Sequence, residues 1–156
     1  MKTSAAAPAR ISVVVPVWHD RINLASLLPE LVRMEDLHEI IVVDAAADPL
    51  TEKLVREAGA TYLRAPAPSR GAQMNLGAAA ATGDALLFQH SDTVVTAAHV
   101  AAVVLALRDP AVTGGAFYRK FDGRHPHLRW LEAVARFFTR HGGTLFGDQS
   151  VFVRRD

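Results

Sequence analysis

Two aspartates and one arginine stand where apolar runs of the chain give way to polar segments. Asp44 follows the run 39–43, Asp92 follows the run 85–88, and Arg70 begins an alanine-rich segment. Such residue types suit a nucleoside diphosphate. One carboxylate can accept hydrogen bonds from a base or ribose, and another can hold a divalent cation together with phosphate oxygens. Arginine can pair with a phosphate through two parallel hydrogen bonds.

The apolar residues alternate between strand and helix patterns along the chain. The apolar runs are continuous, as in parallel strands covered on both faces, and the segments between them follow helical spacing. Pro29 should kink or shorten the first helix. This order predicts an α/β fold with a doubly wound, mostly parallel sheet and helices on both faces. The expected strands are 11–15, 39–43, 61–63, 85–88, 114–118 and 151–153, and the expected helices are 21–34, 51–58, 70–83, 96–108 and 128–140.

In such a sheet, ligands bind beyond the carboxyl ends of the strands, where the strand order reverses. Residues 70–73 lack the Gly-Lys-Ser/Thr of an ATPase phosphate loop, and residues 16–19 replace the glycine-rich turn of dinucleotide enzymes. Both of those classes are therefore disfavoured. The segments expected to form the site are 16–20, 44–48, 66–75 and 89–93.

Length and composition indicate a globular chain of one domain. The chain has 156 residues, of which 50% are hydrophobic and 21% charged. Its net charge of +1 gives no general electrostatic reason to expect nucleic acid as a partner. Cysteine is absent, which fits a cytoplasmic location. The apolar stretch 100–107 is far shorter than a membrane span, and Pro8 and Arg10 interrupt any signal-peptide pattern, so we expect no transmembrane segment.

Several segments together resemble the family 2 glycosyltransferases of the GT-A fold. They are ISVVVPVWHD at 11–20, IVVD at 41–44 and RGAQMNLG at 70–77. Within that family, LFQHSDT at 87–93 and FGDQ at 146–149 are similar to a bacterial subgroup found beside radical-SAM genes. The segments occur in the family's order and extend over nearly the whole chain.

The resemblance implies an inverting, metal-dependent transfer of a sugar from a nucleoside diphosphate sugar, with UDP as the expected nucleotide, to a hydroxyl acceptor. It implies that Asp148 is the catalytic base that deprotonates the acceptor. Asp92 would match the second aspartate of the family's Asp-x-Asp motif and hold Mn²⁺ or Mg²⁺. The expected nucleotide-binding residues are Pro16, Val17, Trp18, Asp44, Arg70, Gln73, Asn75 and His90.

The sequence departs from the family pattern at three places. His90 replaces the first aspartate of the metal motif, and the segment 44–48 lacks the usual glycine and serine. The chain also stops at Asp156, soon after the expected base. We therefore expect a single glycosyltransferase domain over 1–156, with a nucleotide-sugar-binding half at 10–93. The acceptor-side half, 94–156, is expected to be incomplete at its C-terminal end, and a homodimer is compatible with the sequence.

Each of these residues could instead have a purely structural role. Asp92 could cap the following helix, and Asp44 could only form a turn. Arg70 could be a solvated surface residue, and Asp148 an ordinary turn residue. Trp18 is more typical of a core aromatic than of a ring that stacks on a base. Phe137 and Phe138 are expected to be core residues of the last helix, and His125 and His127 to be exposed.

Two other functions remain open from the sequence. One is a nucleotide-sugar-binding module without turnover, which the altered segment 44–48 and the early end of the chain favour. The other is a metallohydrolase that uses His90, Asp92, His125 and His127, although their spacing is poor for a metal site. The sequence does not identify the sugar, the base or the acceptor.

Overall fold

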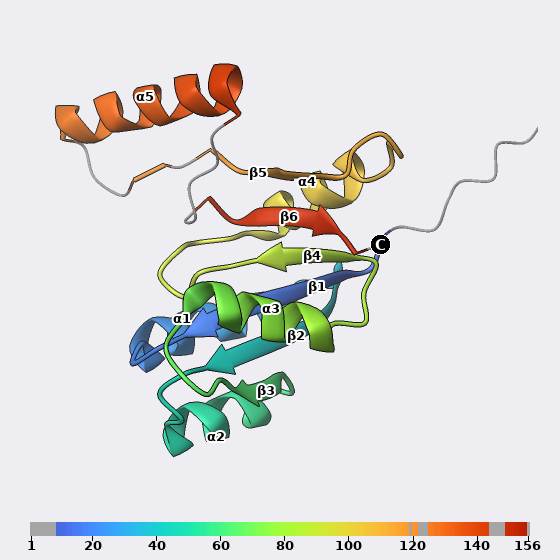
Figure 1. Cartoon of the computed structure of the whole chain (residues 1–156), viewed down its shortest axis with the longest axis vertical. Helices are drawn as coiled ribbons and strands as arrows, with labels where there is room; N and C mark the ends of the chain where they lie inside the picture. Colours follow the sequence, from blue (N-terminus) through green and yellow to red (C-terminus); the bar gives the residue numbers. More distant parts are fainter. Residues whose placement is uncertain (1–8, 119, 122–124, 144–148, 156) are drawn as a thin grey trace, which may run out of the picture.

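The computed structural model describes residues 9–118, 120–121, 125–143 and 149–155. Its centre is a single six-stranded sheet with helices around it (Figure 1). The strands are β1 (Ile11–Val17), β2 (Leu37–Asp44), β3 (Thr61–Arg64), β4 (Ala85–Phe88), β5 (Gly114–Ala116) and β6 (Val151–Arg154). The helices are α1 (Arg21–Val32), α2 (Pro49–Glu57), α3 (Arg70–Ala80), α4 (Ala97–Ala106) and α5 (Pro126–Gly142).

The strand order is β3-β2-β1-β4-β6-β5. The first four strands pair in parallel, whereas β6 runs antiparallel to both β4 and β5. The predicted doubly wound, mostly parallel sheet is confirmed. After β3 the chain returns to the other side of β1, so the strand order reverses between β1 and β4. In sheets of this kind the ligand crevice lies at that reversal, beyond the carboxyl ends of the two strands.

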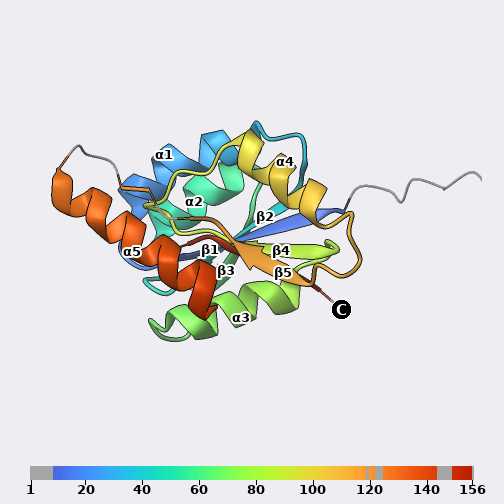
Figure 2. The ribbon, with the colours of Figure 1, turned by 90° about the horizontal axis from the view of Figure 1, so that it is seen from above.

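The side chains of β1 divide the core into two layers. Val13 and Val15 pack into the larger apolar cluster together with residues of α1, α2 and α4. Val14 points to the opposite face, into a smaller cluster that Ala78 of α3 joins. Figure 2 shows this division, with α3 on one side of the sheet and α1, α2 and α4 on the other. Such alternation is the period of a strand buried on both faces.

The last helix departs from this layered arrangement. Figures 1 and 2 show α5 beyond the edge at which β1, β2 and β4 end, rather than on a face of the sheet. Phe137 and Phe138 on this helix are 59% and 49% exposed, so the expectation that they are core residues is wrong. Trp18 is also exposed rather than buried. None of the helices within the described ranges has the length and apolar character of a membrane span.

A glycine sets how closely α3 approaches the sheet. A Cβ atom built on Gly77 would come within 2.3 Å of Val14 Cγ1 and 3.2 Å of Val43 Cγ2. These valines are buried and branch at Cβ, so they have little freedom to move aside. Gly71, on the same helix, has no heavy atom within 4 Å of such a Cβ. The position of α3, and of the residues at its start, therefore depends on Gly77.

We predict opposite effects of alanine at these two glycines. Gly77→Ala should lower the free energy of unfolding by roughly 1–3 kcal/mol, because the added methyl group overpacks the contact with β1 and β2. Gly71→Ala should leave stability unchanged or raise it by about 0.5 kcal/mol, since alanine favours the helix. Urea unfolding midpoints of both variants measure this difference. Equal effects would contradict the close contact at Gly77.

At the opposite edge of the sheet, Glu39 joins three segments of the chain. Its Oε1 atom accepts hydrogen bonds from Ser12 Oγ at 2.6 Å, Thr82 N at 2.6 Å and Thr82 Oγ1 at 2.9 Å. Burial by itself would raise the pKa of Glu39, but these hydrogen bonds outweigh it and lower the pKa below its ordinary 4.5. The ionised carboxylate thus ties β1 and β2 to the turn that precedes β4.

This lowered pKa predicts a stability that depends on pH. The contribution of Glu39 should be fully present above its unfolded-state pKa and should disappear as the pH falls through the lower folded-state pKa. Glu39→Gln should lower the free energy of unfolding by about 1 kcal/mol at neutral pH and flatten its decline in acid. Glu30→Gln, which alters an exposed pair with Arg33, is the matched control. Unfolding curves from neutral to acidic pH would refute this if both variants behaved alike.

Candidate nucleotide-binding site at the strand-order reversal

A pocket of about 310 Å³ opens where the strand order reverses between β1 and β4. We call it the switch-point pocket. The end of β1 and its following loop form one side of it, the loop after β4 another, and the segment leading into α3 the third. The lining residues are Pro16, Val17, Trp18, Asp20, Pro68, Arg70, Gln73, His90, Ser91 and Asp92.

Most of the residues predicted from the sequence meet in this pocket. They are Pro16, Val17, Trp18, Arg70, Gln73, His90 and Asp92. Asn75 lies on an exposed part of α3 and does not line the pocket, and neither does Asp44. Asp148, the expected base, lies outside the residues that the structure describes.

A buried amide shapes the loop that carries His90 and Asp92. Gln89 is fully buried, and its Nε2 donates to the backbone oxygens of His90 at 3.0 Å and Thr93 at 2.5 Å. Its Oε1 accepts a hydrogen bond of 2.7 Å from Ser150 Oγ, just before β6. Both ends of the side-chain amide are therefore satisfied inside the protein. Gln89 thus holds the loop after β4 in place, although its own side chain does not line the pocket.

Asp92 does not cap the helix that follows it. α4 begins at Ala97, and Thr96 is the residue at its N-cap position, with its backbone N–H donating to His99 Nδ1 at 3.0 Å. The carboxylate of Asp92 accepts a hydrogen bond only from Thr93 Oγ1 among the described residues, at 3.2 Å. Asp92 is exposed at the pocket and free to meet a ligand.

His90 presents an unsatisfied nitrogen at the same place. The side chain is 7% exposed, and its Nε2 is buried without a hydrogen-bond partner among the described residues. A buried polar atom left unpaired costs roughly 1–3 kcal/mol, and such atoms are rare in folded proteins. Because His90 lines the pocket, a ligand oxygen or a cation there would supply the missing partner.

The start of α3 adds a positive charge and free backbone donors. Arg70 is the first residue of the helix, and the side chain of Ser69 makes no capping hydrogen bond. The first-turn N–H groups of α3 therefore have no capping acceptor from the Ser69 side chain and could serve an anion at the start of the helix. Gln73 Nε2 donates to Val17 O and Val43 O, at 2.8 Å each, and so joins the helix to the ends of β1 and β2.

Three pocket residues received no role from the sequence, namely Asp20, Pro68 and Ser91. Ser91 Oγ donates a short hydrogen bond to Asp20 Oδ2, which connects the loop after β4 to the loop after β1. Asn23 Nδ2 donates to the other oxygen of Asp20 at 2.7 Å. Asp20 and Ser91 lie in two of the segments expected from the sequence to form the site, 16–20 and 89–93. Their hydrogen bond joins positions 71 residues apart, so no local sequence pattern predicts it.

In this structure Asp44 forms a turn, which is one of the two roles expected for it. It is fully buried, and its carboxylate accepts hydrogen bonds from Ala46 N at 2.8 Å, Asp48 N at 2.9 Å and Tyr62 Oη at 3.1 Å. Burial, followed by the neighbouring Asp44 carboxylate, raises the pKa of Tyr62 to about 12, so the phenol stays a donor. Asp44 holds the turn at the edge of the sheet, and direct contact between its carboxylate and a nucleoside stays a prediction.

The residues present suit a cation held jointly with a ligand. The described part of the chain contains no group of three or more histidine and carboxylate side chains that could hold a metal. The exposed histidines His125 and His127 stack on each other at 5.0 Å, away from the pocket residues. Asp92 can give a cation one hard anionic ligand, and diphosphate oxygens and water are the usual remaining ligands of such a metal.

Comparisons with known proteins agree with this geometry. Residues 12–153 match the family described as glycosyl transferase family 2. Among curated proteins, none matches the chain significantly.

Several solved structures share the fold. Glucosyl-3-phosphoglycerate synthase from Mycobacterium tuberculosis, solved with Mn²⁺, UDP and glucosyl-3-phosphoglycerate, is 25% identical with a TM-score of 0.70, and the match covers 97% of this chain and 59% of that one. A mannosyltransferase from Pyrobaculum calidifontis, solved with GDP-Man and Mn²⁺, is 17% identical with a TM-score of 0.68, and covers 97% and 46%. TarS from S. aureus is 16% identical with a TM-score of 0.70, and covers 94% and 47%.

The chain spans about half the length of these structures, so the comparison concerns the part of each that contains the sheet. The fold and the family match agree with each other, and the expected resemblance to family 2 glycosyltransferases of the GT-A fold is confirmed, while the bacterial subgroup stays a prediction. The chain belongs to glycosyl transferase family 2.

Proposed function

We propose that the chain binds a nucleoside diphosphate sugar in the switch-point pocket and transfers the sugar, with inversion, to a hydroxyl acceptor. The observation that carries this proposal is the meeting of Arg70, His90 and Asp92 in one pocket at the reversal of strand order. A cation ligand, an unpaired imidazole nitrogen and a guanidinium together match the charge pattern of a metal-bound diphosphate. A structural neighbour solved with UDP and Mn²⁺ supports the same class of ligand.

Each side chain then has a distinct task. Arg70 and the first-turn N–H groups of α3 would bind the diphosphate oxygens, and His90 Nε2 would bind one of them or the cation. Trp18 would lie against the base at the exposed rim of the pocket. The hydrogen bond between Ser91 and Asp20 would keep the loop after β4 and the loop after β1 at a fixed separation. Gln73 would hold the start of α3 in place.

The chemical step needs groups on both sides of the sugar carbon. Asp148 would accept the proton of the acceptor hydroxyl, whose oxygen then forms a bond to the anomeric carbon while the bond to the diphosphate oxygen breaks. Attack from the side opposite the leaving diphosphate inverts the configuration. Mn²⁺ or Mg²⁺, held through Asp92, would neutralise charge on the departing diphosphate.

The cytoplasmic location and the homodimer stay predictions.

A thermal-shift experiment tests the pocket. UDP or GDP with Mn²⁺ at a hundred times the dissociation constant should add roughly 2.7 kcal/mol of stability, a rise of roughly 5–10 °C in melting temperature. Asp92→Ala should remove most of that rise. Mn²⁺ alone should change little, because the protein supplies a single carboxylate to the cation.

The control for this experiment is Asp36→Ala, which removes the same charge from an exposed residue outside the pocket. It should leave the shift with nucleotide and Mn²⁺ intact. A full shift in Asp92→Ala would refute the metal role of Asp92, and a loss in both variants would indicate a general effect of net charge.

Turnover separates a transferase from a binding module. We predict that the protein slowly releases UDP from a UDP-sugar and that Asp148→Asn slows the release about 10²–10⁴-fold, the usual contribution of a general base. The variant should keep the nucleotide-dependent rise in melting temperature. If UDP-sugar binds but no UDP is released by either form, the chain is a nucleotide-sugar-binding module instead.

A further inference from the structure

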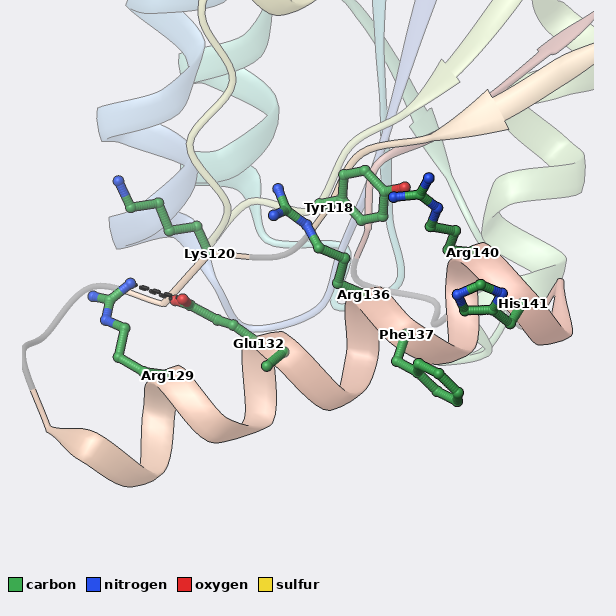
Figure 3. Close-up of a pocket in the computed structure, with 9 residues that line it drawn as sticks. Tyr118, Lys120, Arg129, Glu132, Arg136, Phe137, Arg140 and His141 are labelled. Atoms are coloured by element: carbon green, nitrogen blue, oxygen red, sulfur yellow. Dashed lines mark hydrogen bonds and ion pairs between the residues drawn. The ribbon is translucent and has the colours of Figure 1, made fainter.

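A second and larger pocket, of about 600 Å³, lies between α5 and the segment that follows β5. We call it the α5 pocket (Figure 3). Its lining residues are Tyr118, Lys120, Arg129, Glu132, Ala133, Arg136, Phe137, Arg140 and His141. It shares no residue with the switch-point pocket.

The charge of this pocket is strongly unbalanced. Among the described residues, four arginine and lysine side chains line it against one carboxylate, Glu132. That carboxylate is already engaged, because it accepts hydrogen bonds from Arg129 Nη1 at 2.7 Å and from Phe121 N at 2.7 Å. The hydrogen bond from Phe121 and the nearby Arg129 lower the pKa of Glu132, so it stays ionised and committed to them. Arg136 and Arg140 have no carboxylate partner among the described residues, whereas the charge of Lys120 also acts on Glu132 and helps to lower its pKa.

These cations are gathered rather than dispersed. Arg129, Glu132, Arg136 and Arg140 recur at helical spacing on one side of α5. In Figure 3 the side chains of Arg136 and Arg140 extend from the helix toward Tyr118, whereas the side chain of Lys120 extends away from them. The guanidinium carbon of Arg136 lies 4.9 Å from the centre of the Tyr118 ring, a cation–π contact that fixes its direction. Holding like charges together in a concavity is unfavourable unless an anion enters it.

The helix α5, which forms one wall of the α5 pocket, is connected to the nucleotide site through hydrogen bonds between polar side chains. Thr139 Oγ1 on α5 accepts a hydrogen bond of 3.3 Å from Gln149 Nε2, and the neighbouring Ser150 donates to Gln89. Gln89 in turn holds the loop of His90 and Asp92. α5 also lies beyond the carboxyl ends of the parallel strands (Figures 1 and 2), at the end of the sheet where the switch-point pocket opens. On the proposed function, the acceptor would approach the sugar from this side. An anion in the α5 pocket would therefore lie on the acceptor side.

From this charge and position we propose that the α5 pocket binds a phosphate group carried by the acceptor. Arg140 and Arg136 would bind the phosphate oxygens, and Lys120 would add a third positive charge. Arginine suits this task because its planar guanidinium matches two phosphate oxygens at once. The assignment of the phosphate to the acceptor rests on the proposed transferase function, whereas phosphate binding by the pocket does not.

The test measures phosphate binding directly. The full chain, without nucleotide or metal, is titrated calorimetrically with glycerol phosphate and, as the uncharged control, with glycerol. A second arm measures sedimentation with phosphatidylcholine vesicles that contain or lack phosphatidic acid. We expect binding only where the phosphate monoester is present, and the arm that shows it tells whether the phosphate is soluble or carried by a lipid.

Substitutions tie the binding to the pocket. Arg136→Gln and Arg140→Gln should each weaken it about tenfold, as expected for one charge-assisted pair. Arg140→Lys should retain most of the affinity. Arg108→Gln removes the same charge from an exposed position outside the pocket and should have no effect. Circular dichroism spectra should be unchanged, since all three arginines are exposed.

Two results would overturn the proposal: no phosphate-dependent binding in either arm, or an equal loss in Arg108→Gln and the pocket variants. Failure of the transferase function gives a different pattern. In that case no UDP would be released from a UDP-sugar, or UDP and Mn²⁺ would not stabilise the protein, while glycerol phosphate or phosphatidic acid would still bind and still depend on Arg136 and Arg140.

Discussion

The buried amide of Gln89 is the interaction on which the arrangement of the site depends. Its Nε2 satisfies the backbone oxygens of His90 and Thr93, and its Oε1 accepts from Ser150 at the start of β6. An amide that is fully buried and fully satisfied is a strong constraint, because each broken bond would leave an unpaired polar atom away from water. These hydrogen bonds stabilise the observed conformation of the loop after β4, and the bond from Ser150 requires β6 to lie beside β4.

The other side of the site is held by a similar device. Gln73 donates to the ends of β1 and β2, and Gly77 lets α3 lie against the valines of those strands. The hydrogen bonds of Gln73 thus fix where α3 lies relative to the strand ends, and the absence of a side chain at Gly77 sets the distance between α3 and the sheet. Together they fix where Arg70 begins the helix. Arg70 and Asp92 stay exposed, whereas His90 and the two glutamines that place the site, Gln73 and Gln89, are buried.

Much of the fold follows from the sequence, because periodicity is a local signal. The continuous run of β1 and the helical spacing of α3 require no knowledge of the rest of the chain. The same holds for the segments that end the strands, which is why most of the pocket could be named in advance. Residues 16–18 and 90–92 converge because parallel strands end at the same edge of a sheet.

The remaining features depend on tertiary contacts that no local pattern encodes. Asp44 turns inward because Ala46, Asp48 and Tyr62 all donate to it, and Ala47 adopts a positive φ of 54° within that turn. The bond between Ser91 and Asp20 crosses 71 residues. An amphipathic helix such as α5 has the same periodicity wherever its apolar side faces. Its sequence therefore did not reveal that Phe137 would be exposed.

The replacement of one metal-motif carboxylate by His90 changes the electrostatics of the site. With two carboxylates, a cation could bind strongly before the nucleotide. Among the described residues that line the pocket, the only carboxylate beside Asp92 is Asp20, whose oxygens already accept hydrogen bonds from Ser91 and Asn23. Attraction for a bare cation is therefore weak, while the unpaired His90 Nε2 and the guanidinium of Arg70 favour an anion. The nucleotide and the cation should then enter together, each supplying the charge that the other needs.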